Sequence, residues 1–286
     1  MMSIMGSSET PVRVEPSVQS WAMVSVDGQM IWANDEHRVF YAASLIKLPL
    51  AVAVLRKVDR GECHLDTLIR VRPTISPLSN SLIVIDADSV DPLLDMERTS
   101  SRTSNVAVAG LVERSIIVSS NEACNLLLEE VGFDAVNSVL ADVGARESMV
   151  ARHLFDVTVS SVTQRNVASA ADYATLLATV LRGDLLSPTS TAYLRALLLA
   201  QQDRVAIPAG TPNVGLTNGV IGAVVGNKTG STSTVGHDVA FVEPTDAAPY
   251  CLAVLTSGRP LEDPVVSSAI ASIASRAYEL RRSVDG

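Results

Sequence analysis

Ser44 and Lys47 stand three residues apart at the start of an apolar run that extends to Leu55. Residues at this spacing share one face of a helix, so the serine hydroxyl and the lysine amine can come within hydrogen-bonding distance. A serine hydroxyl is a weak nucleophile until a neighbouring base takes its proton, and a lysine shielded from water can act as that base. The pair therefore indicates nucleophilic catalysis, although serine and lysine at this spacing occur by chance about once in a chain of this size.

Two further motifs follow, each in a fitting local context. Ser119, Ser120 and Asn121 precede a helical pattern, and Lys228-Thr229-Gly230 lies between two strand-like runs. A Lys-Thr-Gly triplet arises by chance in roughly one chain in twenty. A lysine beside a threonine can bind a substrate carboxylate, and a glycine lets a substrate backbone approach closely. The three motifs together indicate an acyl-transfer site.

In this order, the motifs Ser-x-x-Lys, Ser-x-Asn and Lys-Thr-Gly resemble those of the penicillin-recognising serine hydrolases, and within them the class A β-lactamase branch. The resemblance runs from about Trp21 to the C-terminal helix. It implies a mixed α/β (α+β) fold, with an antiparallel sheet built from both chain ends, flanking helices and an inserted all-helical layer. The pattern agrees, because strand-like runs stand near both ends and helical patterns between them.

The resemblance gives each motif residue a role. Ser44 is expected to be the nucleophile, Lys47 its base or proton relay, and Ser119 the group that passes a proton to the leaving group. Asn121 is expected to hold Lys47 as well as a substrate amide. The expected substrate-binding residues are Asn121, Lys228, Thr229, Gly230 and Ser231, with the backbone N–H groups of Ser44 and Ser231 forming an oxyanion hole and the Ser231 hydroxyl adding a further donor.

The chain departs from the class A pattern at the second motif and at a later loop. Ser120 replaces an aspartate whose role is structural. The loop glutamate that activates the deacylating water is missing, because Asp156 is the only carboxylate in residues 152–166. Asn125 nevertheless matches the asparagine that braces this loop. Asp156 and Asn125 are therefore the candidate loop residues, and we expect slow β-lactam hydrolysis with an acyl-enzyme that accumulates.

A third departure concerns the anchor for a substrate carboxylate. Family members often place an arginine on the strands around the third motif, but none lies in residues 214–226 or in the strand after Ser231. Arg259 is the nearest candidate. The dipeptide His237-Asp238 is predicted to stabilise a turn rather than to complete a Ser-His-Asp triad, since Lys47 already fills the base role.

Three functions remain open at this point. The first is a serine hydrolase that acts through an acyl-enzyme on a lactam, amide or ester, with weak action on β-lactams. The second is a D-amino-acid peptidase, or an amidase or esterase similar to penicillin-binding proteins. The third is a ligand-binding module of the same fold that has lost catalysis, which would explain Ser120 and the missing glutamate but not the six intact motif residues, Ser44, Lys47, Ser119, Asn121, Lys228 and Thr229.

Composition limits the partners. The chain has 286 residues, of which 47% are hydrophobic, and this suffices for a substantial core. Its net charge of −9 argues against nucleic acid and anionic membranes. We expect a monomer with a small-molecule substrate, no nucleic acid partner and no membrane partner. No metal or organic cofactor is expected, because the four histidines show no ligand spacing.

Compartment and domain organisation complete the predictions. Three widely spaced cysteines suit a reducing compartment, and the first twenty residues lack the apolar core of a signal peptide. This predicts a cytoplasmic protein, or a secreted one if an exporting segment has been removed.

The predicted units are a tail (1–18), a sheet domain (19–55 with 205–286) and an all-helical domain (56–204). The predicted elements are a hairpin (21–26 and 30–33), a 3₁₀ turn or kink before Pro49, helices at 106–117, 121–131, 170–181, 189–202 and 265–281, and strands at 220–228, 238–242 and 250–255, while 68–104 is predicted to be mostly loop.

Overall fold

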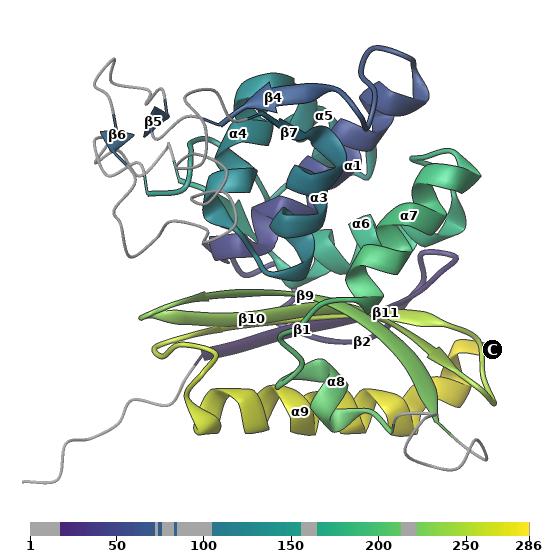
Figure 1. Ribbon diagram of the computed structural model, residues 1–286. Helices are drawn as coiled ribbons and strands as arrows, with labels where there is room; N and C mark the ends of the chain where they lie inside the picture. The colour runs from purple at the N-terminus through teal and green to yellow at the C-terminus, as the bar shows by residue number, and fades with distance from the viewer. Residues whose placement is uncertain are drawn as a thin grey trace, which may run out of the picture.

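The computed structural model describes residues 18–71, 74–75, 83–84, 105–155, 165–212 and 222–285. A five-stranded sheet lies between a layer of helices on one face and a long C-terminal helix on the other (Figure 1). The strand order is β2-β1-β11-β10-β9, and all neighbouring strands are antiparallel. The sheet is therefore built from both ends of the chain, as predicted. Its strands are β1 (Val18–Ser25), β2 (Met30–Asn34), β9 (Ala223–Thr232), β10 (Val235–Pro244) and β11 (Tyr250–Ser257).

The first two strands form the predicted hairpin around Asp27 and Gly28. Gly28 has a φ of +94°, a value that a residue with a side chain rarely adopts. Its N–H donates to the carbonyl of Ser25 at 2.9 Å and closes the turn. The Asp-Gly pair thus provides the local conformation that the hairpin needs.

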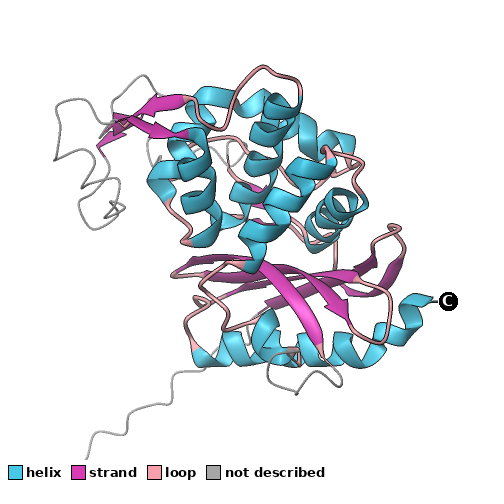
Figure 2. Ribbon diagram, turned by 45° about the vertical axis from the view of Figure 1, so that its right-hand side comes forward, coloured by secondary structure: helices cyan, strands magenta, loops and turns pink. Residues whose placement is uncertain are grey.

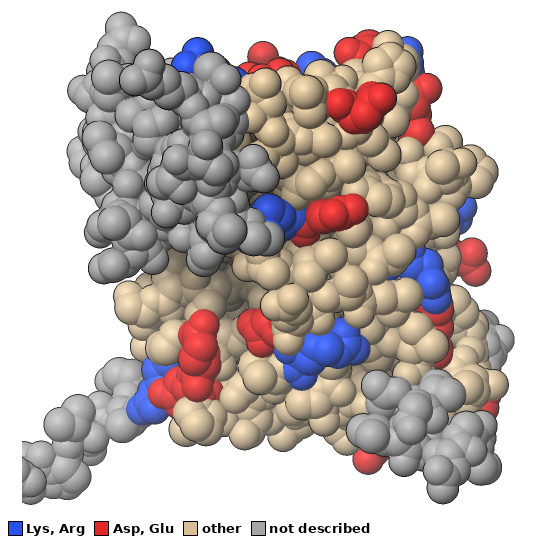
Figure 3. All heavy atoms as spheres, in the orientation of Figure 1, with Lys and Arg blue, Asp and Glu red and all other residues tan. Residues whose placement is uncertain are grey.

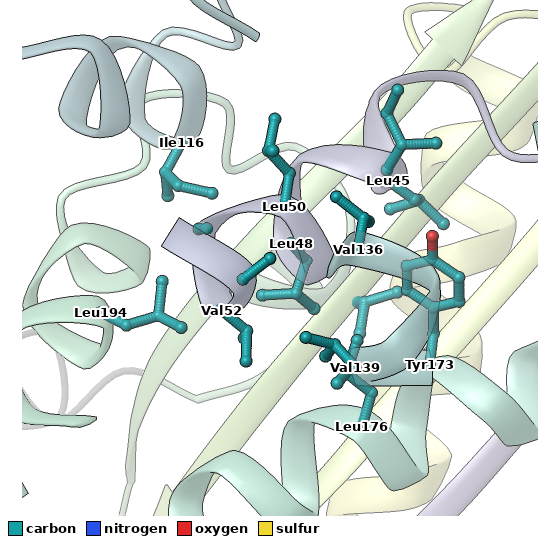
Figure 4. Packing of buried hydrophobic residues seen from close by; sticks show 14 of the residues in the cluster. Leu45, Leu48, Leu50, Val52, Ile116, Val136, Val139, Tyr173, Leu176 and Leu194 are labelled. Atoms are coloured by element: carbon teal, nitrogen blue, oxygen red, sulfur yellow. The ribbon is translucent and has the colours of Figure 1, made fainter. Parts of the chain in front are cut away.

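Helices cover both faces of the sheet (Figure 2). In the helical layer α1 is central and packs on α3, α4, α5 and α7, while α6 lies against β1 and β11. Figure 4 shows Leu48 and Val52 of α1 among side chains of the neighbouring helices. The helices of this layer are α1 (Lys47–Asp59), α3 (Val108–Ile117), α4 (Asn121–Val131), α5 (Phe133–Asp142), α6 (Ala170–Arg182) and α7 (Pro188–Leu199), and those of the other face are α8 (Ile207–Gly210), α9 (Pro264–Glu279) and the 3₁₀ helix η4 (Leu280–Asp285).

The sheet separates two hydrophobic cores, and β11 contributes to both. Its residues alternate between the faces of the sheet, as in any strand. Because both faces are covered, β11 is apolar along nearly its whole length. Cys251, Ala253 and Leu255 enter the core of the helical layer, whereas Tyr250, Leu252 and Val254 enter the core beneath α9.

The start of the central helix agrees with the prediction made from Pro49. A 3₁₀ helix, η1 (Ala43–Ile46), leads directly into α1, and Pro49 is the third residue of α1. A proline in the first turn is tolerated because the N–H that it lacks would have no intrahelical partner there. The helix therefore continues without interruption from Lys47.

Several predicted elements are confirmed, and others were missed. Helix α4 has the predicted bounds, and the Ser169 hydroxyl accepts from the Asp172 N–H at 3.2 Å to cap α6, as predicted. Helices α5 and α8 were not predicted. The prediction that 68–104 is mostly loop did not include the short strands that form there, and apart from these strands and Val71 that stretch lies outside the described residues. Within this stretch β4 (Leu68–Arg70) pairs with β7 (Asn105–Ala107), which follows it, and β5 (Thr74–Ile75) pairs with β6 (Ile83–Val84). A third short pair joins β3 (Phe40–Tyr41) to β8 (Val167–Ala168) elsewhere in the chain.

The domain boundaries stay a prediction, although the predicted cut after residue 55 falls inside α1. No helix among the described residues combines the length and the apolar character needed to cross a membrane. On the face seen in Figure 3, basic and acidic side chains lie close to one another and are surrounded by uncharged residues.

Candidate active site

Ser44 and Lys47 meet at the junction of η1 and α1. Ser44 lies in η1 and Lys47 begins α1, so their side chains share one face of the continuous helix. The two groups are 2.8 Å apart, from Lys47 Nζ to Ser44 Oγ. Ser44 is partly exposed, whereas Lys47 is fully buried. Ser44 is therefore open to solvent in part, while the amine is shielded from water.

The N-terminus of α4 brings the second motif to the same amine. Lys47 Nζ lies 3.1 Å from Ser119 Oγ, 2.6 Å from the Ser119 carbonyl and 2.7 Å from Asn121 Oδ1. Ser119 lies two residues before the start of α4 and has a φ of +57°, in the left-handed region. The N-cap of α4 is Ser120, whose hydroxyl accepts from the Ala123 N–H at 3.2 Å. Ser120, where the resemblance implies an aspartate, thus caps the helix and leaves Ser119 available to the lysine.

The partners of Lys47 determine what its neutral form can do. Two of the four contacting oxygens, the Ser119 carbonyl and Asn121 Oδ1, can only accept hydrogen bonds. A neutral amine has two N–H groups and one lone pair, and these two acceptors occupy both N–H groups. The lone pair is then left to face a hydroxyl, either that of Ser44 or that of Ser119. The arrangement suits proton removal from a serine.

Burial makes the neutral form accessible. It lowers the pKa of Lys47 well below the usual 10.5, and the charge of Lys228 lowers this pKa further. The nearby Cys124 thiol has a smaller opposite effect. Because desolvation disfavours a buried ammonium group, Lys47 loses its proton more readily than an exposed lysine.

Lys228 approaches Ser119 from the other side. It lies on β9, the edge strand of the sheet, and its Nζ donates to Ser119 Oγ at 2.9 Å and to the Thr229 carbonyl at 2.7 Å. Burial lowers the pKa of Lys228 to about 8, while the carboxylates of Asp238 and Asp203 oppose that shift. Ser119 therefore stands between two buried amines, which suits a hydroxyl that relays protons.

The edge strand packs directly on the turn that carries Ser44. A Cβ placed on Gly230 would lie 3.2 Å from the Ala42 carbonyl oxygen and 3.2 Å from the Leu45 nitrogen. Those distances are tighter than ordinary carbon contacts, so a side chain here would push β9 away from η1. The sequence predicts glycine here for the approach of substrate, and the structure adds close backbone packing as a second reason.

Ser231, which follows the third motif, and the predicted anchor Arg259 are engaged elsewhere. Ser231 donates its hydroxyl to Glu262 Oε2 at 2.7 Å and accepts from the Leu261 N–H at 3.0 Å. These bonds occupy the hydroxyl that the sequence assigns to substrate. Thr229 pairs across the sheet with Asp238, and Arg259 donates to Asp263 at 2.8 Å. Substrate contacts of Thr229 and Ser231, and the oxyanion hole, stay predictions.

Asn125 holds the start of the loop on which the glutamate is missing. Its Nδ2 donates to the Leu154 carbonyl at 3.1 Å, and its Oδ1 accepts from the Leu154 N–H at 2.9 Å. Asn125 lies four residues, about one helical turn, after Asn121 on α4, which is about 6 Å along the helix axis. The residue whose backbone this asparagine holds is thus a leucine, not a carboxylate. Asp156 lies outside the described residues.

The two ends of that loop are joined by Asn166, which the sequence reasoning missed. Its Oδ1 accepts from the N–H groups of Ala151 at 2.8 Å and Arg152 at 3.1 Å, and its Nδ2 donates to the Arg152 carbonyl at 3.0 Å. Nothing in the local pattern distinguishes this asparagine from one in an ordinary turn. Its role depends on contacts between segments distant in the sequence.

The prediction that His237 and Asp238 stabilise a turn as a pair is wrong. They are consecutive residues in the middle of β10, so their side chains point to opposite faces of the sheet. His237 Nε2 lies 2.8 Å from the Tyr41 carbonyl, on the side of η1. Asp238 accepts from the Ile207 N–H at 2.9 Å and from Asn227 Nδ2 at 3.0 Å, on the side of α8.

Comparison with known proteins agrees with this geometry. A β-lactamase from Rhodobacter capsulatus is 26% identical over 276 residues, which cover 92% of this chain and 84% of that protein. The crystal structure of the β-lactamase from Sphaerobacter thermophilus DSM 20745 is 30% identical with a TM-score of 0.75, covering 92% of this chain and 91% of that one. The structure of PBP-A is 25% identical with a TM-score of 0.74, covering 94% and 91%.

The profile of one protein family covers nearly the whole chain. This family, Beta-lactamase2, is described as the beta-lactamase enzyme family, and its profile matches residues 15–280. The matched region includes Ser44, Lys47, Ser119 and Lys228. With the antiparallel sheet, the helical layer and the three motifs in place, the chain belongs to the beta-lactamase enzyme family.

Proposed function

We propose that this protein is a serine hydrolase that forms an acyl-enzyme on Ser44 and acts on a lactam, amide or ester. The observation that carries the proposal is the buried amine of Lys47, 2.8 Å from a partly exposed serine hydroxyl. An exposed helix lysine would remain protonated and could not act as a base. The similarity to β-lactamases supports the same chemistry.

The first half of the reaction uses groups in contact with one another. Neutral Lys47 takes the hydroxyl proton as Ser44 Oγ attacks the substrate carbonyl carbon. Ser119 then gives its proton to the leaving nitrogen or oxygen, and Lys47 or Lys228 replaces that proton. The bond between the carbonyl carbon and the leaving atom breaks, and the acyl group stays on Ser44.

The second half lacks an evident base on the loop. A water molecule must attack the acyl-enzyme, and in class A enzymes a loop glutamate deprotonates it. Leu154 is fixed by Asn125 on this loop, and the described residues of the loop, 152–155 and 165–166, include no carboxylate. We therefore propose that β-lactams acylate Ser44 and leave slowly, while simple esters turn over faster. A role for Asp156 as the missing base stays a prediction.

The decisive experiment is mass spectrometry of the intact protein after incubation with benzylpenicillin. The wild type is expected to gain the mass of one penicillin, and peptide mapping is expected to locate it on Ser44. Ser44→Ala should gain none, whereas Ser267→Ala, a matched change on α9, should react like the wild type. A folded wild type that reacts with neither penicillin nor a fluorophosphonate would refute the proposal.

A second candidate is a peptidase or amidase that acts on substrates ending in a D-amino acid. One observation favours it over a fast β-lactamase: Leu154, which is not a carboxylate, occupies the position that Asn125 braces. Lys228 supplies a buried cation that can bind a terminal carboxylate, as it can bind that of a β-lactam. Release of a D-amino acid from a short peptide, lost in Ser44→Ala, would support this candidate. The ligand-binding module without catalysis is disfavoured, because the contacts among Ser44, Lys47 and Ser119 are complete.

A further inference from the structure

The main chain immediately before Ser44 has an unusual conformation. Ala43 has a φ of +47°, in the left-handed region that residues with a side chain seldom enter. Such a conformation persists only where the surroundings fix it from several sides, and it is common at functional sites. The groups that hold this turn therefore help to set the direction of the Ser44 hydroxyl.

Three hydrogen bonds fix the turn around Ala43. The Ala42 N–H donates to the Asn166 carbonyl at 3.0 Å, and the Leu45 N–H donates to the Ala42 carbonyl at 3.0 Å. The third bond joins the Tyr41 carbonyl to His237 Nε2 at 2.8 Å. The first two bonds join backbone groups, so among these three bonds only the third depends on a side chain, that of His237.

The surroundings of His237 define which of its nitrogens carries the proton. The residue is fully buried, and its Nδ1 accepts from the Thr256 N–H at 3.2 Å. The proton of the neutral ring is therefore on Nε2, which donates to the Tyr41 carbonyl. The ring also meets Phe40 edge-on, with centroids 5.9 Å apart.

The neutral form is the stable one at ordinary pH. Burial lowers the pKa of His237 to about 4, and the carbonyls of Tyr41 and Gly236 only partly oppose this. The ring thus keeps one donor and one acceptor, each with a backbone partner. Those partners lie on different segments, since Thr256 belongs to β11 and Tyr41 to β3.

We propose that His237 is a positioning residue for the acylation of Ser44: by holding the Tyr41 carbonyl, it fixes the turn through Ala43 that aims the hydroxyl at the substrate. His237 contacts neither the substrate nor the reacting atoms, and it acts through the backbone. This role rests on the proposed function, because it concerns the acylation step. It differs from a triad, since Lys47 remains the base.

A pair of substitutions separates the two bonds of His237. Asparagine can keep the acceptor for Thr256 but is too short to reach Tyr41. Glutamine can place its amide N–H near the position of Nε2 and so keep the bond to Tyr41. Each variant loses one buried hydrogen bond, so their costs to folding are comparable, but only His237→Asn releases the turn.

The acylation rate constant and the substrate binding constant are measured separately by stopped flow with nitrocefin. A small misplacement of the nucleophile can cost about 10²-fold in rate. We expect a loss of that order in the acylation rate constant of His237→Asn, with little change in binding. His237→Gln should recover most of the lost rate. Equal losses in both folded variants, or an undiminished rate in His237→Asn, would overturn the proposal.

Two measurements do not depend on activity. Nitrogen NMR of the wild-type His237 ring should show the proton on Nε2, and a proton on Nδ1 would overturn the proposal even if His237→Asn does not fold. Amide exchange at Ala42 and Leu45 should accelerate in His237→Asn but not in His237→Gln, and unchanged exchange in the asparagine variant would also refute the role. If no probe acylates the folded wild type, the proposed function fails. The two measurements still test whether His237 fixes the turn through its bond to the Tyr41 carbonyl.

Discussion

In the proposed reaction the two buried lysines perform different tasks, and their charges would set its pH range. Lys47 would have to be neutral to take a proton from Ser44, whereas Lys228 would have to be charged to attract a carboxylate. Burial lowers the pKa of both residues, and that of Lys228 falls to about 8. Lys228 lowers the pKa of Lys47 in turn. In the proposed function, the same pair of residues would therefore set both the strength of the base and the preference for a charged substrate.

This division predicts a bell-shaped pH profile for acylation by a β-lactam with a carboxylate. The rate should rise as pH rises through the lowered pKa of Lys47, because the amine becomes neutral. It should fall as pH rises through the pKa of Lys228, about 8, because the cation is lost. Acylation rates measured across pH for the β-lactam and for an uncharged ester provide the check. The ester should lack the alkaline fall, and identical profiles would show that Lys228 does not select a carboxylate.

At the scale of elements, α4 positions both halves of the site. Asn121 in its first turn holds Lys47, and Asn125 in the next turn holds the backbone of Leu154. Residues four apart lie on the same face of a helix, so one face holds both Lys47 and the backbone of the loop. Asn125 thus holds the loop at Leu154, a residue whose side chain cannot act as a base.

Because Asn125 holds the backbone of Leu154, this position allows the effect of adding the missing base to be predicted. Leu154→Glu places a carboxylate at the position that Asn125 fixes, and general-base help is worth about 10²–10⁴-fold in rate. We expect deacylation of penicillin to accelerate within that range, with acylation little changed. The burst and steady state of nitrocefin hydrolysis measure the two steps. Leu154→Gln has the same size without a base and should remain slow, and equal deacylation in the two variants would contradict this role for the position.

The elements that could be predicted from sequence are those with a local chemical signal. Ser169 and Gly183 mark the ends of α6, and the strands near the C-terminus appear as apolar runs. Helix α5 was missed because Gly132 both ends α4 and begins α5, so no loop separates the two patterns.

Part of the site could not be predicted for a related reason. The sequence identified Ser44, Lys47, Ser119, Asn121 and Lys228 as a group, and their side chains do meet. It could not show which serine caps α4, because the positive φ of Ser119 has no signal in residue type. The bonds from Ser231 to Glu262 and from His237 to Tyr41 join residues far apart in the chain. Such pairings depend on the completed fold.

At the scale of the whole molecule, a single sheet serves two cores. The core of the helical layer and the core beneath α9 both receive side chains from β11, on alternate residues. Loss of packing on one face therefore loosens the strand that the other face needs. We expect the described parts of the chain to unfold as one cooperative unit.

Two substitutions on β11 test this cooperativity. Leu255→Ala removes buried volume from the helical-layer core, and Leu252→Ala removes it from the core beneath α9. Each should lower the free energy of unfolding by about 2–5 kcal/mol, the usual cost of such a cavity. Thermal and denaturant unfolding, followed by near- and far-ultraviolet circular dichroism, should show one coincident transition for both variants. Val265→Ala, at an exposed position, is the control and should change stability by less than about 0.5 kcal/mol. Separate transitions in either core variant would show that the two cores unfold independently.

The bare backbone of Gly230 against the turn of Ala42 and Leu45 has a consequence for how this protein can diverge. The spacing between the turn that carries Ser44 and the strand that carries Lys228 is set by main-chain atoms packed closely together, not by side chains that substitution can lengthen or shorten. Substitutions elsewhere around the site leave that spacing intact. In the proposed function, new substrate preferences would therefore arise around a constant distance between the turn and the strand, through changes in the surrounding side chains.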